Sequence, residues 1–464
     1  MERARARDGE PAVKAVVVGG GLAGAAAAWA LAQRRLEVVL VRRGPGATAL
    51  CWGTLDVAGA SPDPTGLPWR DPVRGEPLTG GERLAFLLRS RPGHPYGVLF
   101  PGRDAARAAR AVKDATAALD GWLRPCGLGV EGSLDETRLL ANVRGAVRVC
   151  DFAFSDAAGG DVARAETLVL IDLPALPGYD ARAAARALGA ELAALGVPGR
   201  SLRVERPAWP ERMLDAAACG PARLAALLDE DEAAAELARA LAAPGGEGRT
   251  LLFPPVLGLA RGERLRRALG AASGATVAEL LGAPPWSPAG LRLDRALLEA
   301  LGRSGVEVHT GRAAQILRRD GRATGVEVEA PEGRASLPAR CVVLATGRFT
   351  GGGLGERDDR VCEALLDLPV FDEWGRRLDR DPARRSLRRP YADPQPLFAG
   401  GVRTDGRLRP LDAAGRPALA NLVAAGELIG GFDPALQHTG LGFALLSGLR
   451  AGEEAAHLAR EVER

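Results

Sequence analysis

The residues best suited to chemistry begin with a glycine-rich turn, Gly19-Gly20-Gly21-Leu22-Ala23-Gly24. Gly19, Gly21 and Gly24 satisfy the pattern GxGxxG between a β-branched run and an alanine-rich stretch that we expect to be helical. Gly19 permits the tight turn, Gly21 lets the backbone approach a phosphate, and Gly24 lets the helix pack closely on the strand. Because the amino terminus of a helix attracts anions, this segment predicts a nucleotide-binding turn.

The acidic residue that commonly ends the second strand of such a unit, and holds an adenosine ribose, is missing. Counting along LEVVLVRR, its place falls at Arg42. An arginine cannot accept a hydrogen bond from a ribose hydroxyl, but it can pair with a phosphate. Two interpretations of Arg42 therefore stay open, a phosphate contact and a side chain that faces solvent.

A second apolar run, Cys341–Leu344, ends in Ala345-Thr346-Gly347, a strand and small-residue turn typical of flavoproteins. A third segment, Asn421–Ala425, leads into Gly426 and Glu427. We expect Glu427 to accept a hydrogen bond from a ribityl hydroxyl. Each segment alone is weak, but all three in this order are typical of a flavin-binding fold.

Gly440 and Gly442 precede an apolar stretch, Phe443–Leu449, that we expect to be helical. The amino terminus of that helix would place positive potential beside the pyrimidine side of a flavin ring, where reduction adds negative charge. His438 lies just before it and is the best candidate for a group that takes a hydroxyl proton. The alternative is a histidine that only packs or positions its neighbours.

The composition sets limits on the class of protein. The chain has 464 residues, 47% of them hydrophobic and 26% charged, which is typical of a folded globular protein. A formal net charge of +3 argues against a nucleic-acid-binding protein. The six cysteines and four histidines are dispersed without a CxxC pair, so we expect no metal site and a cytoplasmic protein.

The pattern of elements predicts an α/β protein with a FAD/NAD(P)-binding Rossmann-like flavoprotein fold and an inserted second α/β domain. Residues 15–33 carry no charge, but the glycines that interrupt them favour strand, turn and helix over a membrane span. From residue 167 onward, apolar runs again alternate with helical stretches. We expect the flavin-binding domain at 11–80 and 284–464, and the inserted domain, for substrate or subunit contact, at 81–283.

Several further motifs resemble one family over nearly the whole chain, the B subunit of anaerobic glycerol-3-phosphate dehydrogenase. They are His94-Pro95-Tyr96, Gly53-Thr54-Leu55-Asp56, Phe349-Thr350-Gly351-Gly352-Gly353-Leu354, Pro284-Pro285, Gly401-Val402-Arg403-Thr404-Asp405 and Gly430-Gly431-Phe432-Asp433-Pro434.

The resemblance implies a flavoprotein that works beside a catalytic A subunit and a membrane-associated iron–sulfur C subunit. That complex oxidises sn-glycerol 3-phosphate to dihydroxyacetone phosphate and passes electrons to quinone. The flavoprotein would be cytoplasmic and held at the inner face of the cell membrane through a partner. FMN is usually assigned to it, and because FMN has no adenosine, Arg42 leads us to expect FMN rather than FAD.

Two alternative functions stay open at this point. One is a non-catalytic, flavin-binding scaffold that bridges the catalytic and iron–sulfur subunits. The other is a stand-alone flavoenzyme similar to fumarate reductase or to ketosteroid dehydrogenase, against which the few histidines and the missing ribose-binding acid count. The resemblance also has a local departure, because Gln437-His438-Thr439 stand where the family is rich in glycine.

Overall fold

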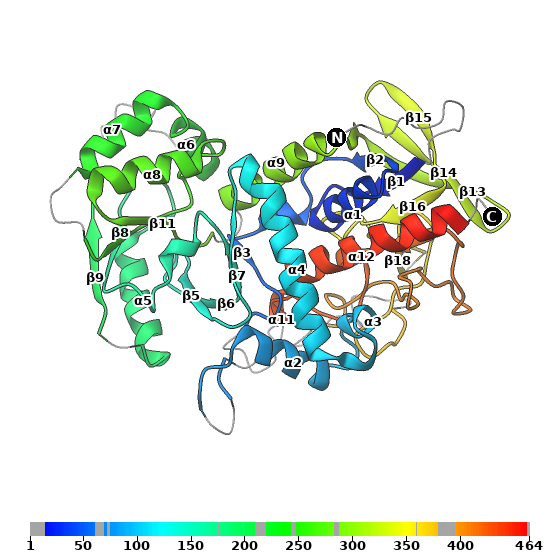
Figure 1. Cartoon of the computed structure of the whole chain (residues 1–464), viewed down its shortest axis with the longest axis horizontal. Coiled ribbons are helices and arrows are strands. Elements are labelled where there is room, and N and C mark those ends of the chain that lie inside the picture. Colours follow the sequence, from blue (N-terminus) through cyan, green and yellow to red (C-terminus); the bar gives the residue numbers. More distant parts are fainter. Residues whose placement is uncertain are drawn as a thin grey trace, which may run out of the picture.

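The computed structural model describes residues 14–60, 69–71, 75–174, 176–197, 199–208, 220–242, 247–282, 287–358, 360–378 and 395–461. Pro284 and Pro285 therefore lie outside the described residues. Figure 1 shows the described chain as two α/β parts at opposite sides of the molecule, with the long helix α4 (Ala105–Leu123) near the middle.

The first part is built on a parallel sheet with the strand order β12-β2-β1-β16-β19. Its strands are β1 (Lys14–Val18), β2 (Glu37–Arg42), β12 (Glu307–Thr310), β16 (Cys341–Leu344) and β19 (Leu422–Ala424). β1 lies between β2 and β16, with Val16 opposite both Val39 and Val342. The expected strand, glycine turn, helix and strand at the start of the chain are confirmed, with α1 at Leu22–Gln33.

Helix α1 packs against the last long helix, α12 (Gly440–Glu461), at very short range. A Cβ atom on Gly448 would overlap the carbonyl oxygen of Ala23, and one on Gly452 would lie 2.6 Å from the carbonyl oxygen of Ala27. The two helices therefore meet backbone to backbone. The helix expected at Phe443–Leu449 is confirmed and is longer, since it begins at Gly440 and continues to Glu461.

The second part is a parallel sheet with the order β11-β10-β8-β9. Three of its strands agree with strands expected from the sequence. The fourth, β11, was not expected, because its four residues are too few and too polar to form a recognisable apolar run. The strands are β8 (Thr167–Ile171), β9 (Ser201–Glu205), β10 (Arg249–Phe253) and β11 (Thr276–Glu279), with helices α5 (Ala181–Ala194), α6 (Pro221–Leu227), α7 (Asp231–Leu241) and α8 (Gly262–Ser273).

The remaining elements join these parts or extend the first one. The helices are α2 (Gly80–Ser90), α3 (Tyr96–Leu99), α9 (Pro288–Arg303) and α11 (Pro434–Gln437). The small sheets contain β3 (Thr54–Leu55), β4 (Val130–Gly132), β5 (Arg138–Ala141), β6 (Val147–Cys150), β7 (Phe152–Phe154), β13 (Arg312–Arg319), β14 (Arg322–Ala330), β15 (Gly333–Pro338), β17 (Leu354–Arg357) and β18 (Arg360–Glu363).

The packing of α2 and α4 places them with the first sheet. Leu84 and Leu87 of α2, and Val112 and Leu119 of α4, belong to the same buried apolar cluster as the strands of that sheet. The second sheet has two apolar clusters of its own, one on each face. The domain boundary expected at residue 81 assigns α2 and α4 to the inserted domain, whereas their packing assigns them to the first part.

No helix of the described residues combines the length and apolar character that crossing a membrane requires.

A buried ionic cluster fastens α9 to the second part. The Arg292 guanidinium lies 2.6 Å from Oδ2 of Asp156 and 2.8 Å from Oε1 of Glu279, and its Nε donates to the carbonyl of Gly258. All three charged side chains are buried. Burial alone would lower the pKa of Arg292, but the two carboxylates outweigh burial and raise it. Charges that leave water together and remain paired hold their elements in one arrangement.

His94 is a core residue surrounded by aromatic rings. Its ring centroid lies 4.6 Å from that of Tyr96 and 5.2 Å from that of Phe432. Nδ1 accepts a hydrogen bond from the backbone N–H of Tyr96, so the neutral ring carries its proton on Nε2, 3.3 Å from the Thr439 hydroxyl. Burial, helped by the charges of nearby arginines, lowers the pKa of His94 to about 3. The motif at residues 94–96 therefore packs the core.

This pKa predicts an acid-sensitive stability. Below the ordinary pKa of 6.5, His94 binds a proton in the unfolded chain but stays neutral in the folded chain. The free energy of unfolding therefore falls as the pH falls. Between pH 7 and pH 5 this group should remove about 2 kcal/mol from the free energy of unfolding. The variant His94→Asn keeps an acceptor for Tyr96 and cannot titrate. Urea unfolding at both pH values should show a smaller pH dependence for the variant, and an unchanged dependence would contradict the assignment.

Candidate active site

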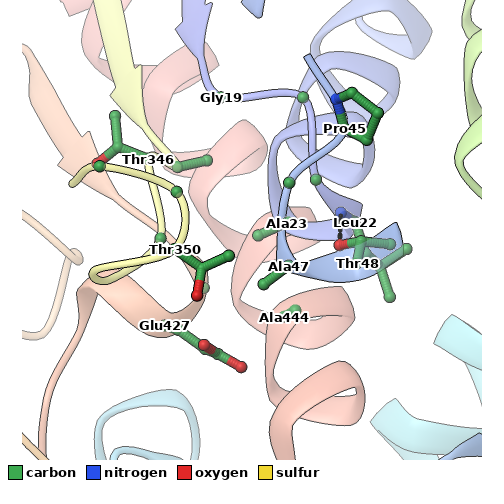
Figure 2. Close-up of a pocket in the computed structure, with 18 of the residues that line it drawn as sticks. Gly19, Leu22, Ala23, Pro45, Ala47, Thr48, Thr346, Thr350, Glu427 and Ala444 are labelled. Atoms are coloured by element: carbon green, nitrogen blue, oxygen red, sulfur yellow. Dashed lines mark hydrogen bonds between the residues drawn. The ribbon is translucent and has the colours of Figure 1, made fainter. Parts of the chain in front are cut away.

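A cavity of about 1140 Å³ opens at the carboxyl ends of the first sheet. It is lined by the residues that follow β1, β2 and β16, and by the start of α12. Ligands of open parallel sheets bind at this edge. Figure 2 shows the two sides of the cavity, with Thr346, Thr350 and Glu427 on one side and the turn from Gly19 to Leu22 and Ala23 on the other.

The glycine turn is held by contacts that exclude side chains. A Cβ atom on Gly19 would overlap the carbonyl oxygen of Ala345, and Gly19 has a φ of +121°, which L side chains rarely adopt. A Cβ atom on Gly24 would overlap the carbonyl oxygen of Gly19 itself. These two glycines let β1, α1 and the end of β16 meet, as expected for this motif.

Gly21 differs from the other two glycines of the motif. A Cβ atom there would lie 3.0 Å from Oγ1 of Thr48 and 3.9 Å from its Cβ. Thr48 also accepts a hydrogen bond from the backbone N–H of Leu22, at 2.9 Å, and so caps the first turn of α1 (Figure 2). The sequence gives no sign of this role, because Thr48 lies 26 residues from its partner, in a short 3₁₀ helix (Ala47–Leu50) without a distinctive pattern.

Arg42 is paired. Both Oδ atoms of Asp294 lie 3.0 Å from its Nη2, and the stem of Arg42 packs on Gly20. Its Nη1 is buried and without a hydrogen-bond partner among the described residues. The interpretation of Arg42 as a solvent-facing side chain is wrong, because only 7% of it is exposed. If Arg42 contacts a phosphate, it does so while paired with Asp294, whose negative charge cancels most of the positive charge of the guanidinium.

The other side of the cavity is formed by the ends of β16 and β19. The Thr346 hydroxyl is buried there without a partner among the described residues. Gly426 turns the chain with a φ of +68°, and its N–H is held by Ser447 of α12 at 2.9 Å. A Cβ on Gly440 would lie 3.1 Å from Oε1 of Glu427, so this carboxylate lies at the first residue of α12.

Most residues selected from the sequence come together around this cavity. Those that line it are Gly19, Gly20, Gly21, Arg42, Ala345, Thr346, Gly347, Gly426, Glu427, His438 and Gly440. Gly24 and Gly442 lie behind the wall and act through packing: Gly24 lies against Gly19, and Gly442 donates its N–H to the carbonyl of Asp56.

His438 lies near α12, in a constrained loop. Its φ of +47° is unusual for a residue with a side chain. Nδ1 of its ring lies 3.1 Å from the carbonyl oxygen of Ala60 and therefore donates to it, which makes Nε2 the acceptor nitrogen of the neutral ring. The ring thus has a fixed position at the cavity wall.

Three polar or aromatic residues of the cavity were not selected as site residues from the sequence. Trp52 and Asp56 come from the segment before and after β3, and Arg148 comes from β6. Asp56 belongs to a motif of the resemblance, but no signal distinguished Arg148 among so many arginines. Cys51 also lines the cavity; burial raises the pKa of its thiol to about 12, so it is an unreactive wall residue.

Comparison with known proteins agrees with this geometry. A family described as "FAD binding domain" matches residues 14–74 and 225–443. The B subunit of anaerobic glycerol-3-phosphate dehydrogenase from Yersinia pseudotuberculosis is 30% identical, over 95% of this chain and 97% of the relative. The probable B subunit of the same enzyme from Halobacterium salinarum is 32% identical over the same shares.

Among solved structures, E. coli quinol fumarate reductase is similar with a TM-score of 0.42 and 11% identity, over 97% of this chain and 71% of that one. FMN as the preferred cofactor is not supported, because the matching family is one of FAD binding. The chain belongs to the family of anaerobic glycerol-3-phosphate dehydrogenase B subunits, a family of flavin-dependent oxidoreductases with an FAD-binding domain.

Proposed function

We propose that the chain binds FAD and is the flavoprotein subunit of a complex that oxidises sn-glycerol 3-phosphate to dihydroxyacetone phosphate and passes the electrons to quinone. The names of its relatives support the substrate and the existence of partner subunits. We take the partners to be a catalytic A subunit and a membrane-associated iron–sulfur C subunit, which would hold this chain at the inner face of the cell membrane.

The observation that carries FAD over FMN is the extent of the cavity. It continues past the glycine turn to the end of β2, where Arg43 and Gly44 line it, to Gly311 between β12 and β13, and to Ala314 in β13. FMN ends in a phosphate at the glycine turn and would leave this region empty. An adenosine would fill it. The missing acid at position 42 therefore does not remove the adenosine pocket.

The residues present fit a dinucleotide. Gly20 and Gly21 give the backbone room to approach a pyrophosphate, and α1 begins directly after them. Two residues that line the cavity each have a buried polar atom without a partner among the described residues: Nη1 of Arg42 and the hydroxyl of Thr346. Buried polar groups are nearly always hydrogen-bonded in native proteins, so these two are suited to a polar ligand.

At the other end, Glu427 and the first turn of α12 would hold the flavin. Glu427 offers carboxylate oxygens to a ribityl hydroxyl, and the amino terminus of α12 favours negative charge nearby. When bound, FAD supplies an acceptor for two electrons from an alcohol. We propose His438 as the group that holds the proton released by the alcohol, since the contact of Nδ1 with the Ala60 carbonyl makes Nε2 the acceptor nitrogen of the neutral ring.

The first prediction concerns the identity of the flavin. The purified chain should be yellow, and mass analysis of the cofactor released on denaturation should find FAD. Titration of the flavin-free chain should give tighter binding of FAD than of FMN, because only FAD fills the cavity beside β2. Tighter binding of FMN would show that the adenosine pocket is not used.

The second prediction separates flavin binding from folding. In Gly21→Ala the added methyl group points toward the Thr48 hydroxyl, at 3.0 Å, rather than into backbone. The variant should fold but bind FAD at least about tenfold more weakly, because the methyl narrows the approach to the pyrophosphate. Gly121→Ala in α4, where a Cβ meets nothing within 4 Å, is the control. Equal FAD affinity in both variants would contradict the proposed pyrophosphate position.

The third prediction tests the reaction. Under anaerobic conditions, sn-glycerol 3-phosphate should bleach the visible absorbance of the flavin-loaded chain, and His438→Ala should slow the bleaching about 10²-fold or more if the ring holds the proton. Bleaching only after addition of the catalytic partner would favour the scaffold function.

A further inference from the structure

One arginine of the cavity lies apart from the others. Among the described residues, the arginines that line the cavity are Arg42, Arg43, Arg148 and Arg312. Arg42 and Arg312 lie together at the end of β2, because the N–H of Gly311 binds the carbonyl of Arg42. Arg148 instead pairs with Asp56, whose backbone carbonyl binds the N–H of Gly442 in the first turn of α12. Its charge therefore stands at the α12 end of the cavity.

Arg148 keeps donors available toward the cavity. Its Nε lies 2.9 Å from Oδ2 of Asp56, and its Nη2 binds the same oxygen. A guanidinium has five N–H donors, so among the described residues this side-on contact leaves both protons of Nη1 and one of Nη2 without an acceptor. The side chain is 20% exposed and lines the cavity. The remaining edge has the geometry that holds two oxygens of a phosphate or carboxylate.

Asp56 adds an acceptor beside these donors. Its Oδ2 accepts from Arg148 and from the Thr54 hydroxyl at 3.1 Å. Its Oδ1 is buried and has no hydrogen-bond partner among the described residues. Asp56 is 5% exposed and lines the cavity. An ionised carboxylate oxygen only accepts, so the group that satisfies Oδ1 must bring a proton, as a hydroxyl does.

The pair is held in a rigid frame. The segment after Asp56 is fixed by the Tyr96 hydroxyl, which donates to the carbonyl of Val57, and by Asp151, which accepts from the N–H of Ala58. The Trp52 ring lies 5.7 Å from the guanidinium carbon of Arg148 and covers one face of it. Side chains fixed in this way can orient a small ligand.

We propose that Asp56 and Arg148 form the substrate subsite, which takes a small hydroxylated anion. The unused edge of Arg148 binds the anionic group, and Oδ1 of Asp56 accepts a hydrogen bond from a hydroxyl on the same molecule. The identity of that molecule as a glycerol phosphate rests on the proposed function. The subsite itself rests on the two unused groups, and it would take a hydroxycarboxylate by the same contacts.

The test separates the two halves of the subsite by binding alone. The flavin-loaded chain is kept reduced and anaerobic, so that no turnover occurs, and Kd is measured by calorimetry. The ligands are sn-glycerol 3-phosphate, propyl phosphate, which has no hydroxyl, and lactate. The variants are Arg148→Gln, Arg148→Lys and Asp56→Asn. Arg267→Gln, from an exposed pair with Glu263 in α8, is the control. Flavin content and melting temperature verify the fold of each variant.

Arg148→Gln should weaken both phosphate ligands about 10- to 100-fold, the usual effect of losing hydrogen bonds from a charged donor. Arg148→Lys keeps the positive charge but loses the paired N–H donors of the guanidinium. Its Kd values should therefore lie between those of the wild type and of Arg148→Gln. Asp56→Asn should weaken glycerol phosphate but leave propyl phosphate equal or tighter, because Arg148 then loses its competing carboxylate. A merely structural role would weaken both ligands together.

The proposal is overturned if wild type binds none of the three ligands, or if Arg148→Gln retains its flavin and binds propyl phosphate with wild-type affinity. If sn-glycerol 3-phosphate binds with the same Kd to wild type, Arg148→Gln and Asp56→Asn, the proposed function stands but the proposed subsite is wrong. Binding of lactate that depends on both residues, without any binding of glycerol phosphate, would support the subsite and remove the proposed substrate.

Discussion

The close approach of bare backbone at the edge of the first sheet is the constraint on which the site depends. Gly19 and Gly24 let β1, α1 and the end of β16 meet without side chains between them. Gly448 and Gly452 do the same where α12 crosses α1. Any Cβ at these places would overlap or crowd a carbonyl group, so the spacing of strand and helices is set by peptide groups, which cannot adapt as side chains do.

That spacing determines two positions at the α12 end of the cavity. Ser447 of this helix holds the N–H of Gly426, and so fixes the turn that carries Glu427. One turn earlier, Gly442 approaches Asp56 so closely that a Cβ would lie 2.5 Å from its carbonyl oxygen. The proposed acceptor for a ribityl hydroxyl, Glu427, and the proposed acceptor for a substrate hydroxyl, Asp56, are therefore both positioned by contacts with the same helix. A ligand on either one meets a wall that is already in position.

The sequence predicted the local features well, because each depends on residues close together in the chain. The glycine turn, the strands at 341–344 and 422–424 and most of the second sheet have such local patterns. It did not predict contacts between distant residues. The partner of Arg42 lies 252 residues away, and that of Arg148 lies 92 residues away. The expectation of FMN rests on the family resemblance and on the residue type at position 42, but one residue does not define a pocket that several other segments also line.

Helix α9 shows how far such distant pairs extend. Arg292 and Asp294 lie two residues apart on it, and both are buried. Arg292 is fastened to Asp156 and Glu279 beside the second sheet, whereas Asp294 holds Arg42 at the end of β2. Breaking a buried ion pair leaves an uncompensated charge, so separating either pair would cost a large free energy. A displacement of the second sheet would therefore pull on α9 and, through Asp294, on the cavity wall beside Gly20. The contacts of α9 thus link the second part to the adenosine end of the proposed FAD site. None of the four parallel strands of the second part lines the cavity itself.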